Sequence, residues 1–449
     1  MIKLKVSILF FFLAINLFPQ DQRSPNIVLI MADDLGYEAI NVNGGISYQT
    51  PNIDKLAYNG MRFENCHSEP LCTPSRVRIM TGKNNKKNYI DFEILDKKEI
   101  VFSQLLKKNG YKTLIAGKWQ LGKNKDLPKH FGFDEYFLWQ HQLGRTNDMG
   151  NDTRYSNPVL EKNGIISKYD NGSFSSDLFV EYINDFITRN KENPFLVYYP
   201  MLFTHCPFVP TPKSKDWNPK DQGSISYEGN PVYFGDMVKH MDKMVGRIVD
   251  HINQLELAEN TIIIFTSDNG TDEPIISETT SGKIIGGKGK SSDNGTHVPL
   301  IVSWKGKIAE GSVNSSLIDF SDFLPTICEV SDSEIPEKNG IDGVSFLPQL
   351  MGKKNSIKKW IYSWYYPRPY EKSNVYNPST GNGTKATEWT RNKNYKLYSD
   401  GRFYSIKNDF YEKIPLEMKT LNRFERISYN ELLKGLNSHK NISWIRKSN

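Results

Sequence analysis

The chain has 449 residues and a mass of 51.6 kDa, which is large enough for more than one hydrophobic core. Its composition, with 38% hydrophobic and 24% charged residues, is typical of a globular protein. Its formal net charge of +6 is spread along the sequence without a long run of lysine or arginine. This distribution gives nucleic-acid binding little support, and we expect no nucleic-acid partner.

The N-terminal residues 1–20 are predicted to form a signal peptide. Lys3 and Lys5 precede an apolar run at residues 6–18, which is too short to span a bilayer comfortably. Cleavage is expected near Gln20, and no later stretch is apolar enough to cross a membrane. We therefore expect an exported protein, periplasmic or secreted, with no membrane span in its mature form.

Continuous apolar runs predict strands that are buried on both faces of a mostly parallel sheet. These runs occupy residues 26–34, 111–122, 194–205, 261–270 and 298–304. Segments with helical spacing of apolar residues lie between them, at 101–110, 231–257 and 315–327. Gly110 is placed to cap the first of these helices at its C-terminus. The alternation predicts an α/β domain with helices on both faces of the sheet.

The composition of the sequence changes after about residue 352. Aromatic residues are concentrated at 360–370, and residues 395–404 are predicted to form a hairpin that turns at 399–401. We therefore predict a catalytic domain at residues 21–352 and a smaller C-terminal subdomain at 353–449 with an antiparallel sheet.

Polar side chains follow two of the predicted strands. Asp33 and Asp34 end one apolar run, and Asp268 and Asn269 end another. A single aspartate in such a place could equally cap a helix. However, ligands of open α/β sheets bind beyond the carboxyl ends of the strands, and three carboxylates gathered there would repel each other without a cation. Carboxylate and amide oxygens suit a hard ion, Ca²⁺ or Mg²⁺, better than zinc.

The four cysteines leave two interpretations open. An even number in an exported chain permits disulfides, and Cys66–Cys72 is one conceivable pair. We expect Cys206 and Cys328 to be free, buried thiols.

Four separated motifs resemble those of the formylglycine-dependent sulfatases, which belong to the alkaline phosphatase superfamily. In chain order they are NIVLIMADDLG at 26–36, CTPSR at 72–76, GKWQLG at 117–122 and TSDNG at 266–270. The resemblance extends over essentially the whole mature chain. It implies an α/β fold with a large mixed, mostly parallel sheet flanked by helices, and a smaller C-terminal antiparallel-sheet subdomain.

The resemblance also implies an unusual use of Cys72. In the family, a maturation enzyme (a formylglycine-generating or sulfatase-maturing enzyme) oxidises this cysteine to formylglycine during export. The hydrated aldehyde attacks the sulfur of a sulfate ester, and its second hydroxyl then expels sulfate from the covalent intermediate. An ordinary nucleophilic or structural cysteine is the alternative.

Further roles are carried over from the matching motifs. The ligands of the Ca²⁺ are expected to be Asp33, Asp34, Cys72, Asp268 and Asn269. Arg76, one helical turn after Cys72, is expected to reach back to the modified residue.

Three further segments carry basic side chains that match functional residues of the sulfatase family. Lys118 and Lys288 match the sulfate-binding lysines, and we choose Lys288 over Lys290 because it occupies the Gly-Lys-Gly position of GGKGK. His205 matches the histidine that donates a proton to the leaving oxygen or holds the sulfate.

Gln120 departs from the family pattern, which commonly has a histidine at this position. A glutamine can hydrogen-bond to the modified residue or the substrate but cannot accept a proton at neutral pH. The identity of the base is therefore open, with solvent and His205 as the alternatives.

The substrate is predicted to be a sulfated carbohydrate, such as a polysaccharide fragment. Residues 137–158 could overhang the pocket, and His141, Arg145 and Arg154 on this segment, together with His297, are candidate substrate-binding residues. Two other functions remain in view: a phosphodiesterase or phosphonate monoester hydrolase of the same superfamily, and an inactive carbohydrate-binding relative.

Overall fold

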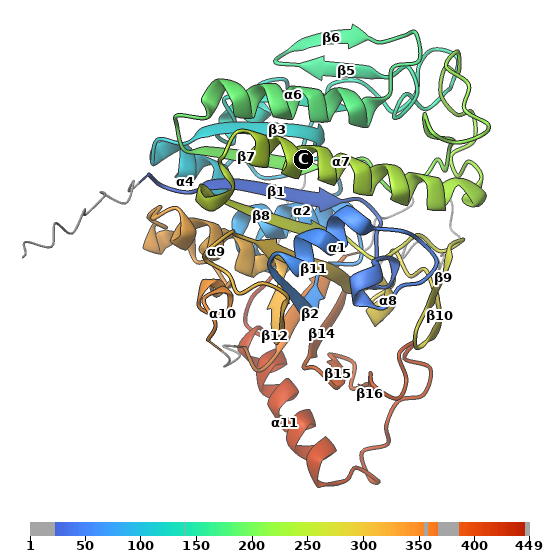
Figure 1. The fold of residues 1–449 in the computed structure, drawn as a ribbon. Coiled ribbons are helices and arrows are strands. Elements are labelled where there is room, and N and C mark those ends of the chain that lie inside the picture. Colours follow the sequence, from blue (N-terminus) through green and yellow to red (C-terminus); the bar gives the residue numbers. More distant parts are fainter. Residues whose placement is uncertain (1–22, 140, 354–357, 367–385, 445–449) are drawn as a thin grey trace, which may run out of the picture.

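A ten-stranded mixed sheet forms the centre of the protein. The computed structural model describes residues 23–139, 141–353, 358–366 and 386–444, so the predicted signal peptide lies outside the described residues (Figure 1). The strand order is β12-β2-β11-β8-β1-β7-β3-β4-β5-β6. In this order the strands are β12 (Ser312–Asp319), β2 (Met61–His67), β11 (His297–Ser303), β8 (Thr261–Ser267), β1 (Asn26–Ala32), β7 (Phe195–Pro200), β3 (Lys112–Lys118), β4 (Glu135–Trp139), β5 (Val159–Lys162) and β6 (Ile165–Lys168).

The middle of this sheet is parallel. β1 pairs in parallel with β7 and β8, and β3 pairs in parallel with β7 and β4, whereas β11, β5 and β6 run antiparallel to their neighbours. All seven residues of β1 and of β8 are buried, as the continuous apolar runs predicted. Parallel pairing brings the carboxyl ends of β1, β7, β8 and β3 to one edge of the sheet.

Helices cover both faces (Figure 1). One core, on the face of α1, α6 and α7, includes Leu56, Ile183 and Met241, and the other, on the face of α2, α4 and α9, includes Ile79 and Leu106. The helices of this body are α1 (Pro51–Tyr58), α2 (Cys72–Thr81), α3 (Asn85–Asn88), α4 (Phe102–Lys108), α5 (Leu127–His130), α6 (Ser175–Asn190), α7 (Phe234–Gln254), α8 (Asp293–Thr296), α9 (Phe323–Val330) and α10 (Leu347–Leu350).

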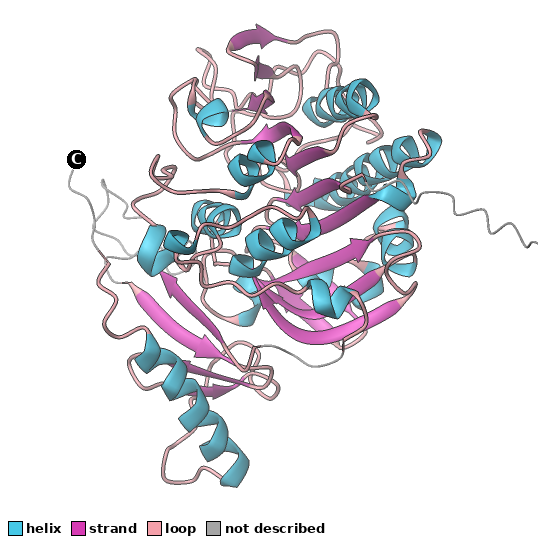
Figure 2. Cartoon of the chain, turned by 90° about the vertical axis from the view of Figure 1, so that its left-hand side faces the viewer, coloured by secondary structure: helices cyan, strands magenta, loops and turns pink. Residues whose placement is uncertain are grey.

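A second, antiparallel sheet and a long helix form the C-terminal part, which lies below the main body in Figure 2. Its strands follow the order β13 (Ile361–Tyr365), β14 (Thr387–Arg391), β15 (Tyr395–Tyr398) and β16 (Phe403–Ser405), and the helix is α11 (Arg423–Ser438). The predicted hairpin is β15–β16, with Gly401 at a φ of +94° in its turn. The predicted fold class is therefore confirmed. A two-stranded ribbon, β9 (Ile276–Thr279) and β10 (Gly282–Ile285), stands apart from both sheets.

One secondary-structure prediction is wrong. Residues 315–327 were expected to be a single helix, but residues up to Asp319 belong to β12, which pairs in parallel with β2 at the sheet edge. A short 3-10 turn with Asp319 as its N-cap follows, and α9 begins only at Phe323. Pairing with β2 at the sheet edge therefore overrides the helical spacing of the apolar residues.

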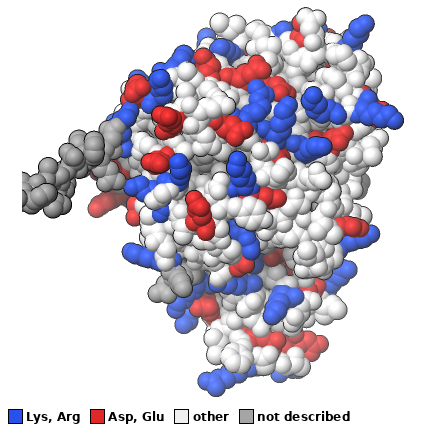
Figure 3. Space-filling model, in the orientation of Figure 1, with Lys and Arg blue, Asp and Glu red and all other residues white. Residues whose placement is uncertain are grey.

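Charged side chains of both signs alternate over the face drawn in Figure 3. This mixture agrees with a net charge of +6 that is spread along the sequence. Among the described residues, no helix has both the length and the apolar character that crossing a bilayer requires.

Candidate active site

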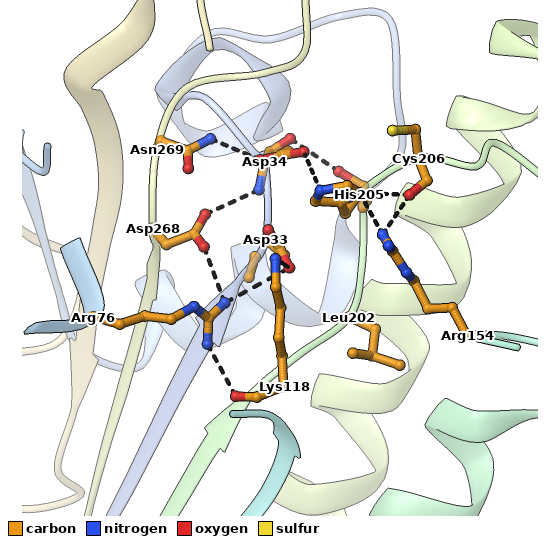
Figure 4. A network of polar contacts seen from close by, with 12 residues as sticks. Asp33, Asp34, Arg76, Lys118, Arg154, Leu202, His205, Cys206, Asp268 and Asn269 are labelled. Carbon is orange, nitrogen blue, oxygen red and sulfur yellow. Dashed lines mark hydrogen bonds and ion pairs between the residues drawn. The ribbon is translucent and has the colours of Figure 1, made fainter. Parts of the chain in front are cut away.

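Asp33, Asp34, Asp268 and Asn269 lie together at the carboxyl ends of neighbouring strands (Figure 4). The register of β1 and β8 pairs Ala32 with Ser267, so the residues that follow each strand are placed side by side. All four side chains are completely buried. The backbone N–H of Asp34 donates to Oδ1 of Asp268 at 3.1 Å, and Nδ2 of Asn269 donates to Oδ1 of Asp34 at 2.8 Å.

The local backbone explains two features of these motifs. Asp34 has a φ of +60°, a left-handed conformation that aspartate tolerates better than most residues and that turns the chain away from the strand. Gly270 follows Asn269 where a Cβ atom would lie 1.9 Å from the carbonyl oxygen of Asn294. Only glycine fits there, because the backbone of α8 at Asn294 and Gly295 packs directly against this turn.

Arg76 joins the cluster from α2. Its Nη2 donates to Oδ2 of Asp268 at 3.0 Å and lies 3.6 Å from Oδ2 of Asp33, while its Nη1 donates to the carbonyl oxygen of Lys118 at 3.1 Å. The arginine is 1% exposed. Its permanent charge therefore lies between two buried carboxylates, in a geometry that uses both arms of the planar fork.

Two lysines reach the cluster from other segments. Nζ of Lys118, at the end of β3, donates to Oδ2 of Asp33 at 2.6 Å. Nζ of Lys288 donates to Oδ2 of Asp34 and lies 3.4 Å from Oδ2 of Asp272. The buried carboxylates are thus surrounded by three basic side chains from three different elements.

These neighbours have opposite effects on the carboxyl groups. Burial raises the pKa of Asp268 to about 7, and the charge of Asp33 acts in the same direction. Burial also raises the pKa of Asp34 to about 6. Burial alone would raise the pKa of Asp33 too, but Lys118 and Arg76 lower it below its ordinary value. A cation bound beside such a buried carboxyl group would stabilise its ionised form and lower its pKa.

The donor atoms fit a hard divalent cation. Oδ1 of Asp33 and Oδ1 of Asn269 are buried and have no hydrogen-bond partner among the residues that the structure describes, so two oxygens of the cluster are available as ligands. Asp33, Asp34 and His205 also offer ligand atoms that all lie within 4.8 Å of one another. Oxygens predominate in this set, as Ca²⁺ and Mg²⁺ prefer.

Cys72 is the first residue of α2, one turn before Arg76. It is 3% exposed, and burial raises the pKa of its thiol, on which the charges of Lys118 and Asp268 also act. All four cysteines are free and buried, so the conceivable Cys66–Cys72 pair does not form. A buried thiol with a raised pKa is a poor nucleophile as it stands.

His205 approaches the cluster from the side opposite to Arg76. It follows β7, and its Nε2 lies 3.7 Å from Oδ2 of Asp34 and 3.3 Å from Nζ of Lys288. Arg154 contacts its other ring nitrogen, Nδ1 (Figure 4). Burial lowers the pKa of the imidazole well below its ordinary value, and the charges of Arg154 and Lys288 add to this effect.

Comparison with known families identifies the family of this chain. Residues 25–333 match the family described as Sulfatase, and residues 290–442 match the one described as N-sulphoglucosamine sulphohydrolase, C-terminal. The first match covers more than half of the chain. The chain belongs to the sulfatase family. Similar curated sulfatases include N-acetylgalactosamine-6-sulfatase of Mus musculus, 29% identical over 84% of this chain and 74% of its own length, and arylsulfatase A of Homo sapiens, 30% identical over 80% of this chain and 74% of its own length.

Solved structures share the fold of this sulfatase. The crystal structure of Ps i-CgsB superimposes with a TM-score of 0.76 at 24% identity and covers 95% of this chain and 96% of its own. The phosphonate monoester hydrolase of Agrobacterium radiobacter superimposes with a TM-score of 0.69 at 19% identity, covering 92% of this chain and 96% of its own. The fold is therefore common to sulfatases and phosphonate hydrolases, while the family match and the curated relatives make this chain a sulfuric ester hydrolase.

The remaining candidate residues of this sulfatase differ in how they lie relative to the acidic cluster. Lys290 pairs with Glu273 at 2.8 Å rather than with the cluster, whereas Lys288 reaches Asp34. Gln120 has a φ of +54°, and its buried Oε1 has no hydrogen-bond partner within the described part of the chain.

Three of the predicted substrate-binding residues stand apart from the carboxylates. His141 is buried against the rings of Trp119 and Tyr136. Nε2 of His297 donates to the carbonyl oxygen of Glu64 at 2.9 Å, and its ring stacks on the rings of Tyr37 and His67. Arg145 is partly exposed, and its guanidinium lies 4.4 Å from the ring centroid of Tyr227.

Tyr227 is a site residue that the sequence did not reveal. It is 51% exposed, and its ring meets the ring of His205 edge to face, with 6.3 Å between the centroids. It lies in a loop far from the recognised motifs, and a single tyrosine in a polar loop gives no signal of its own. Only the folding of this loop onto the segment of Arg145 brings it beside His205.

Proposed function

We propose that this sulfatase hydrolyses sulfate esters of a carbohydrate, with a formylglycine made from Cys72 and a Ca²⁺ held by the acidic cluster. The observation that carries the proposal is the placement of Cys72. It begins α2 in a buried site that also holds Asp33, Asp268 and Arg76, whose charges all act on its thiol. An unmodified thiol there has a raised pKa, whereas a hydrated aldehyde would supply the nucleophilic hydroxyl that the reaction needs.

The cation would be bound by Asp33, Asp34, Asp268 and Asn269, with residue 72 beside them. When bound, it would polarise the nucleophile and stabilise negative charge. The partnerless Oδ1 atoms of Asp33 and Asn269 support this assignment, and Ca²⁺ is preferred to Mg²⁺ because the ligands are protein oxygens in a dry site.

The basic side chains of the chain would bind the substrate anion. Lys118 and Lys288 now neutralise Asp33 and Asp34, and they become available for sulfate oxygens when those carboxylates hold a cation instead. Arg76 is fixed between two carboxylates, so it holds residue 72 and its surroundings in place. Nε2 of His205 faces the same space and would contact the sulfate or the leaving oxygen.

Relatives support a carbohydrate as the substrate. Curated relatives include N-acetylgalactosamine-6-sulfatases, and similar structures were solved with a neocarrahexaose and with D-glucosamine-2-N,6-O-disulfate as substrate. The exposed ring of Tyr227, covered on one side by Arg145, suits a sugar that carries a further negative charge.

Export and maturation complete the proposal. The N-terminal apolar run supports a signal peptide, and a formylglycine-generating or sulfatase-maturing enzyme would be met on the way out of the cytoplasm. We also propose the division of the mature chain near residue 352, because the antiparallel sheet and α11 follow that point.

The test combines mass spectrometry and sulfate release. Peptides containing residue 72 are analysed after co-expression with a maturation enzyme, and sulfate release is measured on sulfated galactosamine, glucosamine and galactan oligosaccharides and on matched phosphate esters. Conversion of Cys72 with sulfate release is expected. Cys72→Ala is expected to abolish turnover, whereas Cys66→Ala, at a buried cysteine on β2, keeps it. Activity of a fully unmodified enzyme, or cleavage of phosphate but not sulfate esters, would contradict the proposal.

A further inference from the structure

Arg154 is a buried arginine that bonds to the histidine of the site. It is 3% exposed and lies on the long segment between β4 and β5. Its Nη1 donates both to Nδ1 of His205 and to the carbonyl oxygen of Cys206. Its guanidinium carbon lies 4.5 Å from the ring centroid of Trp139, and its Nη2 lies 3.5 Å from Oδ2 of Asp152. Little of this side chain is left to meet a substrate.

The contact constrains where the ring proton of His205 resides. A guanidinium can only donate hydrogen bonds, so the Nδ1 atom that it contacts must accept one. The carbonyl oxygen of Cys206 also lies beside Nδ1 and would favour the opposite tautomer, with the proton on Nδ1. Arg154 and the Cys206 carbonyl therefore favour opposite tautomers, but one Nη1 group of Arg154 donates to both Nδ1 and the carbonyl oxygen, so the carbonyl does not need the ring proton.

We propose that Arg154 is a positioning residue that keeps the ring proton of His205 on Nε2. On the other side of the ring, Nε2 lies 3.7 Å from Oδ2 of Asp34, which can accept its proton. Nζ of Lys288, 3.3 Å from Nε2, can only donate, so it opposes this tautomer unless it bonds to Asp34, to Asp272 or to a bound anion instead. With Lys288 engaged in that way, the tautomer directs an N–H group into the space where the ester would bind. The assignment replaces the sequence-based interpretation of Arg154 as a substrate ligand. Its catalytic consequence rests on the proposed function, but the tautomer itself does not.

The consequence for the reaction depends on the leaving group. An N–H on Nε2 stabilises the oxygen that departs with the sugar, and a sugar alcohol needs this help far more than a nitrophenolate does. Removing Arg154 allows Nδ1 to donate to the Cys206 carbonyl and leaves a lone pair on Nε2. We expect Arg154→Met to lower kcat/KM about 100-fold for sulfated sugars and less than about tenfold for 4-nitrophenyl sulfate.

Nitrogen NMR of the full chain tests the tautomer directly. Histidine-specific ¹⁵N labelling gives signals from only 8 histidines. The two ring-nitrogen signals that disappear in His205→Gln are those of Nδ1 and Nε2 of His205. The wild-type protein is expected to show a protonated Nε2 and a bare Nδ1, and Arg154→Met to show the reverse or a mixture. A proton on Nδ1 in the wild type would overturn the proposal, and so would an unchanged tautomer in a folded Arg154→Met protein.

Arg391→Met is the matched control. Arg391 is also 3% exposed, and its Nη1 lies 3.0 Å from Nδ1 of His67, outside the acidic cluster. Its loss is expected to leave the His205 signals and the leaving-group dependence unchanged. If Arg154→Met does not fold, the wild-type spectrum and Arg154→Lys still test the proposal. A lysine ammonium can only donate, so Arg154→Lys is expected to keep the wild-type tautomer.

The two proposals fail in different ways. A converted enzyme that releases no sulfate from any ester refutes the proposed function, while the NMR result stands by itself. An active sulfatase whose Arg154→Met variant loses sugar and nitrophenyl sulfate turnover equally refutes the role of Arg154 and leaves the proposed function intact.

Discussion

The ion pair between Arg76 and Asp268 gives the sharpest prediction about the site. The two side chains are at most 1% exposed, and their charged atoms lie 3.0 Å apart. At an effective dielectric constant of about 20, this distance corresponds to an attraction of about 5 kcal/mol, which the cost of removing both charges from water largely offsets. The ion pair therefore adds little to the free energy of unfolding, but removing one partner lowers that free energy strongly because the other charge stays buried and unpaired.

The perturbation is a double-mutant cycle in calcium-free buffer. Arg76→Met leaves Asp268 and Asp33 as buried carboxylates with one fewer cation, and we expect it to lower the free energy of unfolding by about 3–5 kcal/mol. Asp268→Asn loses hydrogen bonds and is expected to cost about 1–3 kcal/mol. In the Arg76→Met background, however, Asp268→Asn removes an unpaired charge and is expected to stabilise the protein.

Urea unfolding followed by the fluorescence of the 8 tryptophans measures each variant. The buffer is kept at about pH 9, well above the pKa of about 7 that burial gives Asp268 in the wild type, because loss of Arg76 raises this pKa further. A coupling energy of about 2–3 kcal/mol is expected. Additive effects, with Asp268→Asn destabilising in both backgrounds, would refute the reasoning.

A matched ion pair provides the control. Nη2 of Arg78 and Oδ1 of Asp319 are also 3.0 Å apart and nearly fully buried, but they lie outside the acidic cluster. Added Ca²⁺ is expected to reduce the cost of Arg76→Met, because the cation neutralises the carboxylates that the variant leaves unpaired. The cost of Arg78→Met is expected to stay the same.

Three further predictions concern the neighbouring residues and the cation. Gln120→Ala is expected to lower kcat/KM for sulfate release about tenfold, the value of one hydrogen bond, and a loss as large as that of Cys72→Ala would give Gln120 a larger role. Ca²⁺ at about 100 times its Kd is expected to stabilise the chelator-treated protein by about 2.7 kcal/mol, seen as a rise in Tm that Mg²⁺ reproduces only in part, and no rise with either ion would contradict the cation site. Burial alone would raise the pKa of Asp319, but Arg78 and Lys358 lower it, so this carboxylate stabilises the fold above about pH 4 and loses that contribution as the pH falls through its folded-state pKa. Asp319→Asn is therefore expected to flatten the pH dependence of the unfolding free energy below about pH 4, and an unchanged slope would contradict this.

Much of the architecture follows from local sequence. An uninterrupted apolar run such as residues 26–32 is favourable only when both faces of a strand are covered, so its burial in the centre of the sheet was predictable. The polar residues Asp33 and Asp268 directly after such runs were predictable as a site, because parallel strands end at a common edge. The motif around Cys72 added the chemistry.

The tertiary structure decided what the sequence left open. Residues 315–319 have helical spacing, yet pairing with β2 makes them a strand. Arg154 could have faced a substrate, yet it bonds to His205, which lies 51 residues away.

The sequence by itself thus determined which side chains end the strands and which segment carries the sulfatase motif with Cys72. The structure determined which basic side chains pair with which carboxylates, and it placed the ring of Tyr227 against that of His205. The physical reason is that strand burial and helix periodicity are properties of neighbouring residues, whereas partner choice among charged side chains depends on distances set by packing across the whole chain.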